Sequence, residues 1–216
     1  MVPSFNEHAT RFAFPARLYP IADTLGDAQR SHLAIAEAIL AGGAPLLQLR
    51  VKDQATARCV EVARAVKAAT DRHAARLIIN DRADIATLVD AAGVHLGQDD
   101  LPPAAARRQL GPRAIIGLST HTVEQADAAA QTGLVDYIGF GPIFPTTSKR
   151  RPDPIQGLDG LRAVRRQVSV PIVAIGGITA DTIPAVLAAG ADAVAMIGDI
   201  VRAADITATV RRLLGS

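Results

Sequence analysis

Eight short apolar segments recur along the chain from about residue 17, and longer segments with apolar residues at helical spacing separate them. The expected strands are 17–23, 45–50, 76–80, 93–96, 114–119, 136–141, 171–176 and 193–198. The expected helices include 30–41, 54–73, 122–131, 158–167 and 180–189. Strands that are apolar along their whole length and are joined by crossover helices favour a parallel sheet. Their number favours a single-domain α/β fold, a closed (βα)8 TIM barrel, over a doubly wound sheet of about five or six strands.

The organisation of the chain indicates one folded domain. No low-complexity tract or linker rich in Pro, Gly and Ser divides the 216 residues, and a chain of this length can bury a large core. We expect the barrel to span 17–216 and residues 1–16 to form an N-terminal extension without the apolar region of a signal peptide. The longest apolar stretch, 33–49, is interrupted by Glu37 and Pro45, so we expect no membrane span.

Charge and composition argue against a nucleic acid partner. Lys and Arg total 23 against 21 Asp and Glu, a net charge of +2, and aromatic residues are only 3% of the chain, so neither a basic run nor a stacking surface is present. The single Cys59 falls in a helical pattern, which favours a packed thiol over a nucleophile and fits a reducing cytoplasm. The expected partners are small-molecule substrates, and self-association into a homo-oligomer is left open.

Polar side chains gather where the expected strands end, which is where ligands bind in barrels of this kind. The second strand ends in Gln48, Arg50 and Lys52, which stand at alternate positions and therefore project to the same side of an extended segment. Two cations at the same end of the barrel favour a bound anion that neutralises their charge. The alternative is a charged loop in contact with solvent.

The third and fourth strands each end in a carboxylate. Asn80 and Asp81 follow one strand and Asp100 follows the next, and two carboxylates with substrate phosphates are a common set of ligands for Mg²⁺. Either carboxylate could instead cap the helix that follows it. Beside Arg50 and Lys52 the pair favours a metal-diphosphate site.

The later strands end in residues typical of phosphate binding. The segment GFGPIFPTTSK at 139–149 combines glycines, hydroxyls and a lysine, although a plain connecting turn has the same composition. Glycines also follow the seventh and eighth strands ahead of helices, as in the phosphate sites of these barrels. His95 and His121 lie at strand ends, where a core position or a helix start is the alternative to a ligand contact. Two anion sites and one metal on a single rim indicate transfer of a group from a diphosphate ester to a phosphorylated nucleophile.

Seven separated blocks resemble the thiamine phosphate synthase family over about 18–214: QLRVK, INDRADIA, GVHLGQDD, IGLSTHT, DYIGFGPIFPTTSK, PIVAIGGI and GADAVAMI. The resemblance implies a (βα)8 transferase that joins 4-amino-5-hydroxymethyl-2-methylpyrimidine diphosphate to 4-methyl-5-(2-hydroxyethyl)thiazole phosphate. The products are thiamine monophosphate and pyrophosphate, and the cofactor is Mg²⁺.

The resemblance also assigns roles to the residues of this chain. It implies a pyrimidine diphosphate site, a metal site and a thiazole phosphate site. The pyrimidine diphosphate site comprises Tyr19, Gln48, Arg50, Lys52, Asn80, His95, Ser119 and Lys149. The metal site comprises Asp81 and Asp100. The thiazole phosphate site comprises Thr146, Ser148, Gly177, Ile197 and Gly198. Within this set it implies catalytic roles for Arg50, Lys52, Ser119 and Lys149.

Three positions depart from the family pattern. Val51 replaces a usual glutamate, Ser148 replaces a threonine, and Gly198 replaces a serine that would donate a hydrogen bond to the thiazole phosphate. From the missing hydroxyl we expect weaker affinity for the thiazole substrate with activity retained. Two alternatives are a thiazole tautomerase of the same barrel family, in which His121 would transfer the proton, and a non-catalytic barrel that binds thiamine phosphate.

Overall fold

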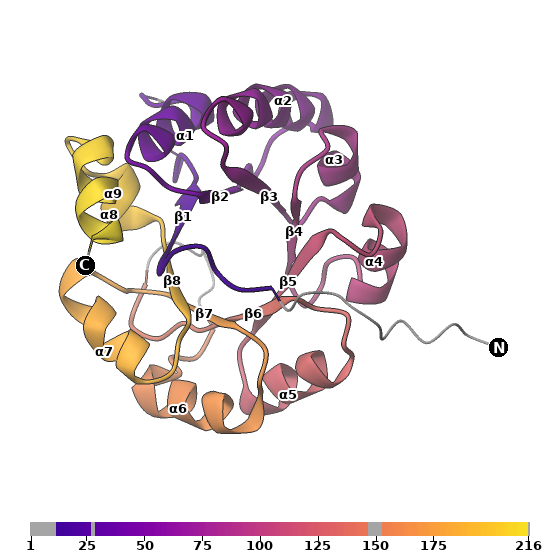
Figure 1. Ribbon diagram of the computed structural model, residues 1–216, viewed down its shortest axis with the longest axis vertical. Coiled ribbons are helices and arrows are strands. Elements are labelled where there is room, and N and C mark those ends of the chain that lie inside the picture. The colour runs from indigo at the N-terminus through magenta and orange to yellow at the C-terminus, as the bar shows by residue number, and fades with distance from the viewer. Residues whose placement is uncertain (1–11, 27–28, 147–152, 216) are drawn as a thin grey trace.

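The computed structural model describes residues 12–26, 29–146 and 153–215, and its strands form a closed barrel in which every neighbouring pair is parallel (Figure 1). The strands are β1 (Leu18–Ala22), β2 (Leu46–Leu49), β3 (Arg76–Asn80), β4 (Gly93–Leu96), β5 (Ile115–Thr120), β6 (Tyr137–Phe140), β7 (Ile172–Ile175) and β8 (Ala193–Met196). Pairing of β1 with β8 closes the barrel. All eight predicted strands are confirmed, each within two residues at either end.

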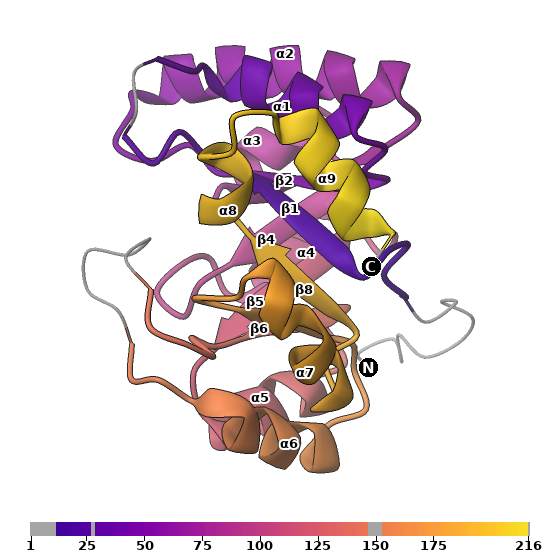
Figure 2. The same cartoon turned by 90° about the vertical axis from the view of Figure 1, so that its left-hand side faces the viewer.

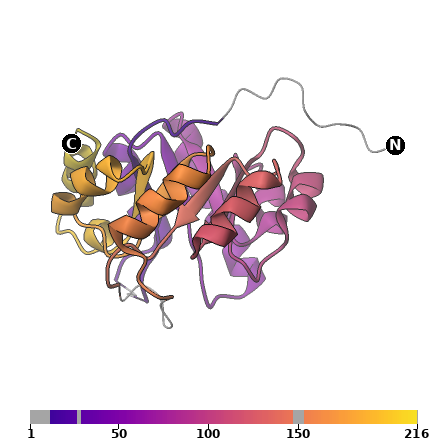
Figure 3. The same cartoon turned by 90° about the horizontal axis from the view of Figure 1, so that it is seen from below.

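Helices surround the strands on the outside of the barrel (Figures 1 and 2). They are α1 (His32–Ala41), α2 (Thr56–Arg72), α3 (Ala83–Leu88), α4 (Pro103–Leu110), α5 (Val123–Gln131), α6 (Gly157–Gln167), α7 (Ile183–Ala188), α8 (Gly198–Val201) and α9 (Ile206–Leu214), with a 3-10 turn η1 at Ala180–Thr182. Seen from below, the orange helices of the last third of the chain lie in front of the strands (Figure 3). The helix expected over 180–189 is divided, because η1 precedes α7 and Pro184 lies in the first turn of α7.

Alternation along each strand divides the buried side chains into two cores. On β1, Leu18 and Ala22 face the helices, whereas Tyr19 and Ile21 face the barrel interior. The interior contains mainly aliphatic side chains together with Tyr19 and Tyr137. The outer core is almost entirely aliphatic and includes the thiol of Cys59, which is buried on α2 as predicted.

The segment before β1 packs against the aromatic residues of the barrel interior. The ring of Phe14 lies 5.7 Å from the ring of Tyr19 and 5.1 Å from that of Tyr137, and Phe12 lies 5.7 Å from Tyr137. In Figure 1 this indigo segment crosses the opening of the barrel. The boundary of the barrel domain at residue 17 stays a prediction. Within the described residues, none of the helices combines the length and apolarity needed to cross a bilayer.

Candidate active site

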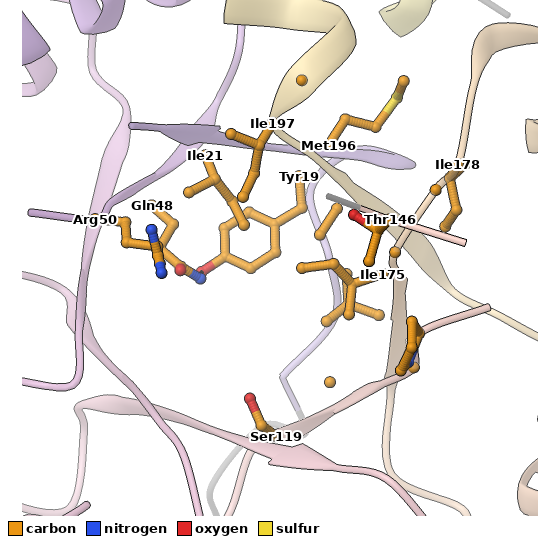
Figure 4. A pocket seen from close by; sticks show the side chains of 18 of the residues that line it. Tyr19, Ile21, Gln48, Arg50, Ser119, Thr146, Ile175, Ile178, Met196 and Ile197 are labelled. Atoms are coloured by element: carbon orange, nitrogen blue, oxygen red, sulfur yellow. The ribbon is translucent and has the colours of Figure 1, made fainter. Parts of the chain in front are cut away.

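A cavity of about 470 Å³ opens at the carboxyl ends of the strands. Its lining includes most of the residues predicted from the sequence to contact the substrates: Tyr19, Gln48, Arg50, Asn80, His95, Ser119, Thr146, Gly177, Ile197 and Gly198. Figure 4 shows Arg50 and Gln48 on one side of this cavity, Ser119 on another and Thr146 across from Arg50. Residues far apart in the sequence are therefore brought to one place because the parallel strands all end on the same rim.

The other predicted residues have different positions. Lys52, Asp81 and Asp100 are not part of the cavity lining, but they adjoin it because Asp81 follows Asn80 and its backbone N–H donates to the carbonyl of His95 at 2.7 Å. Ser148 and Lys149 lie outside the described residues. The roles assigned to all of these residues stay predictions.

A chain of buried hydrogen bonds crosses the floor of the cavity. Gln48 Nε2 lies 3.1 Å from Tyr19 Oη, which lies 3.0 Å from Tyr137 Oη. Tyr137 Oη lies 2.9 Å from His95 Nδ1, and His95 Nε2 lies 2.9 Å from Ser119 Oγ. The chain therefore links two residues on opposite sides of the site, Gln48 and Ser119, through three buried rings.

The direction of donation is fixed only at the first member of this chain. The amide nitrogen of Gln48 can only donate, so Tyr19 Oη accepts from it, whereas the bonds from Tyr19 to Tyr137 and from Tyr137 to His95 Nδ1 can run either way. Our hypothesis is the order in which Tyr19 donates to Tyr137 and Tyr137 donates to His95 Nδ1. Burial raises the pKa of both tyrosines, so both keep their protons. In that order His95 would carry its proton on Nε2 and donate it to Ser119 Oγ. The hydroxyl proton of Ser119 would then be available to a ligand in the cavity.

Gly117 and Gly139 leave room for these buried rings. A side chain at Gly117 would collide with the ring of Tyr137, and a Cβ at Gly139 would lie 3.0 Å from the ring of His95. The pairing of β5 with β6 places Ser119 opposite Gly139. Glycine in the two strands therefore provides the space that the tyrosine and histidine occupy.

The two cations after β2 each pair with a carboxylate from a neighbouring strand. Arg50 forms an ion pair with Asp23, which follows β1, and Lys52 forms one with Asp81, which follows β3. The predicted alternative, a charged loop in contact with solvent, is wrong for Arg50, whose side chain is 23% exposed. Arg50 also lines the cavity, whereas the side chain of Lys52 is 46% exposed and agrees with that alternative.

The carboxylates of Asp81 and Asp100 lie beside one another. Burial raises the pKa of Asp100, and the charge of Asp81 raises it further, against an opposing hydrogen bond from the N–H of Gly97 at 2.6 Å. Neither residue caps a helix, because the N-cap positions of α3 and α4 are Arg82 and Pro102, without side-chain cap bonds. The capping alternative is therefore wrong for this pair.

The two carboxylates fit the Mg²⁺ that the family resemblance implies. They supply hard oxygen ligands in the number that Mg²⁺ commonly takes from protein, and a divalent cation would relieve their mutual repulsion. Asp81 has φ of 64°, a left-handed conformation that Asp tolerates better than most residues. No group of three or more His, Cys, Asp or Glu side chains that could hold a metal is found in the described ranges.

On the opposite side of the cavity, two glycines allow the loop after β7 to approach the loop after β6. Gly176 and Gly177 have φ of 99° and 63°, and a Cβ on Gly177 would lie 2.7 Å from the Cβ of Phe144. Only glycine combines this conformation with so close an approach. The backbone of Gly177, together with Thr146, consequently lines the part of the cavity that the sequence assigns to a phosphate.

Sequence reasoning missed several residues of the site. Tyr137 joins the two halves of the buried chain, Asp23 holds Arg50, and Arg202 on α8 lines the cavity. Asp23 stands at the end of β1, so the rule that polar residues gather at strand ends could have found it. His121 also lines the cavity, and its Nδ1 lies 2.8 Å from the carbonyl of Gly141.

Comparisons with known proteins agree with this geometry. The family model described as thiamine monophosphate synthase matches residues 18–200. A thiamine-phosphate synthase of Chloroflexus aurantiacus is 46% identical over 197 residues, with 91% of this chain and 90% of the relative covered. One of Moorella thermoacetica is 45% identical over 196 residues, covering 91% and 93%.

A solved structure shows the same relationship in three dimensions. The thiamine phosphate pyrophosphorylase from Pyrococcus furiosus superposes with a TM-score of 0.80 at 34% identity, covering 92% of this chain and 93% of that one. The family match extends over every strand and reaches α8, so it includes all the described residues that line the cavity except Arg202. This chain therefore belongs to the thiamine monophosphate synthase family.

Proposed function

We propose that this thiamine-phosphate synthase, a transferase, joins its two substrates in the cavity at the carboxyl ends of the strands. The pyrimidine diphosphate would occupy the side formed by β1 to β5, and the thiazole phosphate the side formed by β6 to β8. The observation that carries the proposal is the convergence of Gln48, Arg50, Asn80 and Ser119 with Thr146 and Gly177 on one cavity. Polar groups from both halves of the barrel can then act on a single pair of ligands.

The residues around Arg50 would hold the diphosphate. Arg50 can donate parallel hydrogen bonds to phosphate oxygens, and Ser119, whose Oγ lies 2.9 Å from His95 Nε2, would donate its hydroxyl proton to the diphosphate. Lys52 and, outside the described residues, Lys149 would add positive charge. Asp81 and Asp100 would hold Mg²⁺, which when bound supplies charge neutralisation for a departing diphosphate.

The bond changes are balanced without a protein base. The C–O bond between the pyrimidine methylene and the diphosphate breaks, and its electron pair leaves with pyrophosphate. The lone pair of the thiazole nitrogen then forms the new C–N bond, and that nitrogen has no proton to lose. This requirement agrees with a site that contains charged groups and hydrogen-bond donors rather than an activated nucleophile.

The acceptor side would orient the thiazole nitrogen toward that carbon. Backbone groups of Gly177 and Gly198, with Thr146 and the Ser148 that lies outside the described residues, would hold the thiazole phosphate at the far end of the cavity. Holding both substrates in this way converts a reaction between two molecules into one within a complex. The comparisons name synthases, and they give the tautomerase alternative through His121 no support.

A turnover assay with both substrates tests the proposal. Thiamine phosphate, followed by fluorescence after oxidation, should form with Mg²⁺ and should fall sharply when the metal is chelated. Asp81→Asn should lower turnover strongly while the chain stays folded, because Asn also tolerates the left-handed backbone at this position. Asp71→Asn is the matched control, since Asp71 pairs with Lys67 on the exposed face of α2. Absence of product from wild-type protein with Mg²⁺ would refute the proposed reaction.

Two further expectations accompany the proposed reaction. The buried, unpaired thiol of Cys59 supports activity in a reducing cytoplasm, which fractionation of the native host would test. Self-association stays a prediction, and light scattering of the purified protein would measure it.

A further inference from the structure

Arg202 brings a positive charge to the acceptor side of the cavity. It is the C-cap residue of α8, the short helix that follows β8 (Figure 2), and it lines the cavity together with Gly177 and Gly198. Among the described residues its guanidinium makes no hydrogen bond or ion pair, and its backbone N–H donates to the carbonyl of Gly198 at 3.0 Å. A charged donor is therefore available at the place where a phosphate is expected.

The guanidinium occupies the space into which a side chain at position 198 would project. A Cβ on Gly198 would lie 2.5 Å from Arg202 Nη1 and 3.5 Å from its Cζ. Residues four apart lie on the same face of a helix, and side chains point back toward the N-terminus. Arg202 can extend over position 198 because glycine leaves that face open. The weaker affinity for the thiazole substrate that we expected from the sequence took account only of the missing serine hydroxyl at position 198.

We propose, on the basis of the proposed condensation, that Arg202 binds the phosphate of the thiazole substrate and that Gly198 leaves the room that the Arg202 side chain needs. A guanidinium donates charge-assisted hydrogen bonds in a planar fork that matches phosphate oxygens. Asp199 lines the same part of the cavity, and Arg202 would offset the repulsion between that carboxylate and the phosphate. This chain would thus use a charged donor from α8 and would discriminate strongly between the phosphorylated acceptor and the free alcohol.

A second cavity provides a matched control. It has a volume of about 300 Å³ and is lined by Arg202, Asp199 and Arg212 among others. Arg212, on α9, does not line the first cavity. Arg212→Gln removes the same charge as Arg202→Gln from the same region but leaves the proposed phosphate contact in place.

The first test compares Michaelis constants for the two acceptors. Arg202→Gln should raise KM for thiazole phosphate roughly two- to fivefold, the range for an exposed charged contact. KM for the pyrimidine diphosphate, kcat, and KM for the unphosphorylated thiazole alcohol should stay unchanged, and Arg202→Lys should recover part of the loss. Arg212→Gln should match wild type in every constant. An unchanged KM for thiazole phosphate in Arg202→Gln, or an equal rise in Arg212→Gln, would overturn the inference.

The second test uses Gly198→Ser, which forces the flexible end of Arg202 to move. In wild type this change should not lower KM for thiazole phosphate, because it exchanges one phosphate donor for another. In the Arg202→Gln background the same change should lower KM, because it supplies a donor where none remains. Equal improvement in both backgrounds would show that Arg202 does not contact the phosphate.

Calorimetric titration with thiazole phosphate alone separates this inference from the proposed reaction. Weaker binding in Arg202→Gln than in wild type supports the phosphate contact whether or not turnover occurs, whereas equal affinities count against it. Absence of turnover in wild type would instead refute the proposed condensation.

Discussion

Replacing Tyr137 by phenylalanine would remove the oxygen that joins the two halves of the buried hydrogen-bond chain. That oxygen lies 3.0 Å from Tyr19 Oη and 2.9 Å from His95 Nδ1. Its loss leaves Tyr19 Oη and His95 Nδ1 each short of one buried hydrogen bond, and each buried unsatisfied group costs about 1–3 kcal/mol. We expect the free energy of unfolding to fall by about 2–6 kcal/mol, which most domains with about 5–15 kcal/mol of stability survive.

The same change should alter catalysis through the histidine. Without a proton donated to Nδ1, the imidazole of His95 can carry its own proton there, and Nε2 then accepts from Ser119 instead of donating to it. The hydroxyl proton of Ser119 would no longer reach the diphosphate. A hydrogen bond to a charged group contributes about 1.5–3 kcal/mol, so kcat/KM should fall by roughly 10- to 150-fold.

A double-mutant cycle isolates this route. Urea unfolding would measure the stability of each variant, and kcat/KM would be determined for wild type, Tyr137→Phe, Ser119→Ala and the double variant. If Tyr137 acts through Ser119, adding Tyr137→Phe to Ser119→Ala should cause little further loss. An equal loss in both backgrounds, or full activity in Tyr137→Phe despite the loss of stability, would refute the reasoning.

Three other outcomes are expected. Mg²⁺ without substrates should raise the melting temperature of wild type but not of Asp100→Asn, and equal shifts in scanning fluorimetry would argue against the carboxylate pair. Burial lowers the pKa of His32, whose Nε2 lies 3.0 Å from the carbonyl of Arg50, so the unfolded chain binds more protons as pH falls from about 6.5. Wild-type stability should then drop with a slope of at most about 1.4 kcal/mol per pH unit, and denaturation of His32→Asn between pH 7 and 5 should show a shallower fall. Phe14→Ala should cost about 1–3 kcal/mol of unfolding free energy by uncovering interior aromatic rings, whereas Leu88→Ala at an exposed helix position should change it by less than about 0.5 kcal/mol.

The barrel could be predicted from the sequence because each strand is apolar on both faces and short. A strand such as AVAM of β8 is buried along its whole length, and this is the pattern that separates parallel barrel strands from half-exposed ones. The strand ends also indicated which polar residues share a rim. Arg50 and Asn80 come together for this reason alone, since the register pairs β2 with β3 from Leu46 to Leu49.

What the sequence did not show depends on register and on side chains that cross the barrel. The pairing of Ile21 with Gln48 and of Ala22 with Leu49 places Asp23 beside Arg50, and a one-residue shift would have reversed which residues face the interior. Tyr137 contacts His95 from two strands away, over Gly117. Neither contact can be predicted from neighbouring residues in the sequence, because the sequence shows the spacing of residues along a strand but not their distance across the barrel.

The charges at the rim explain why a divalent cation and the diphosphate would depend on each other. Around the proposed diphosphate site, the described ion pairs and the carboxylate pair comprise two cations, Arg50 and Lys52, and three carboxylates, Asp23, Asp81 and Asp100, so their formal charges sum to −1. Lys149, outside the described residues, would bring this charge only to neutrality. A diphosphate that arrives without a metal therefore meets no excess of positive charge, and its affinity should rise steeply with Mg²⁺. The ion pairs hold both cations in place until the diphosphate arrives, so binding would require the cations to exchange partners rather than to become ordered.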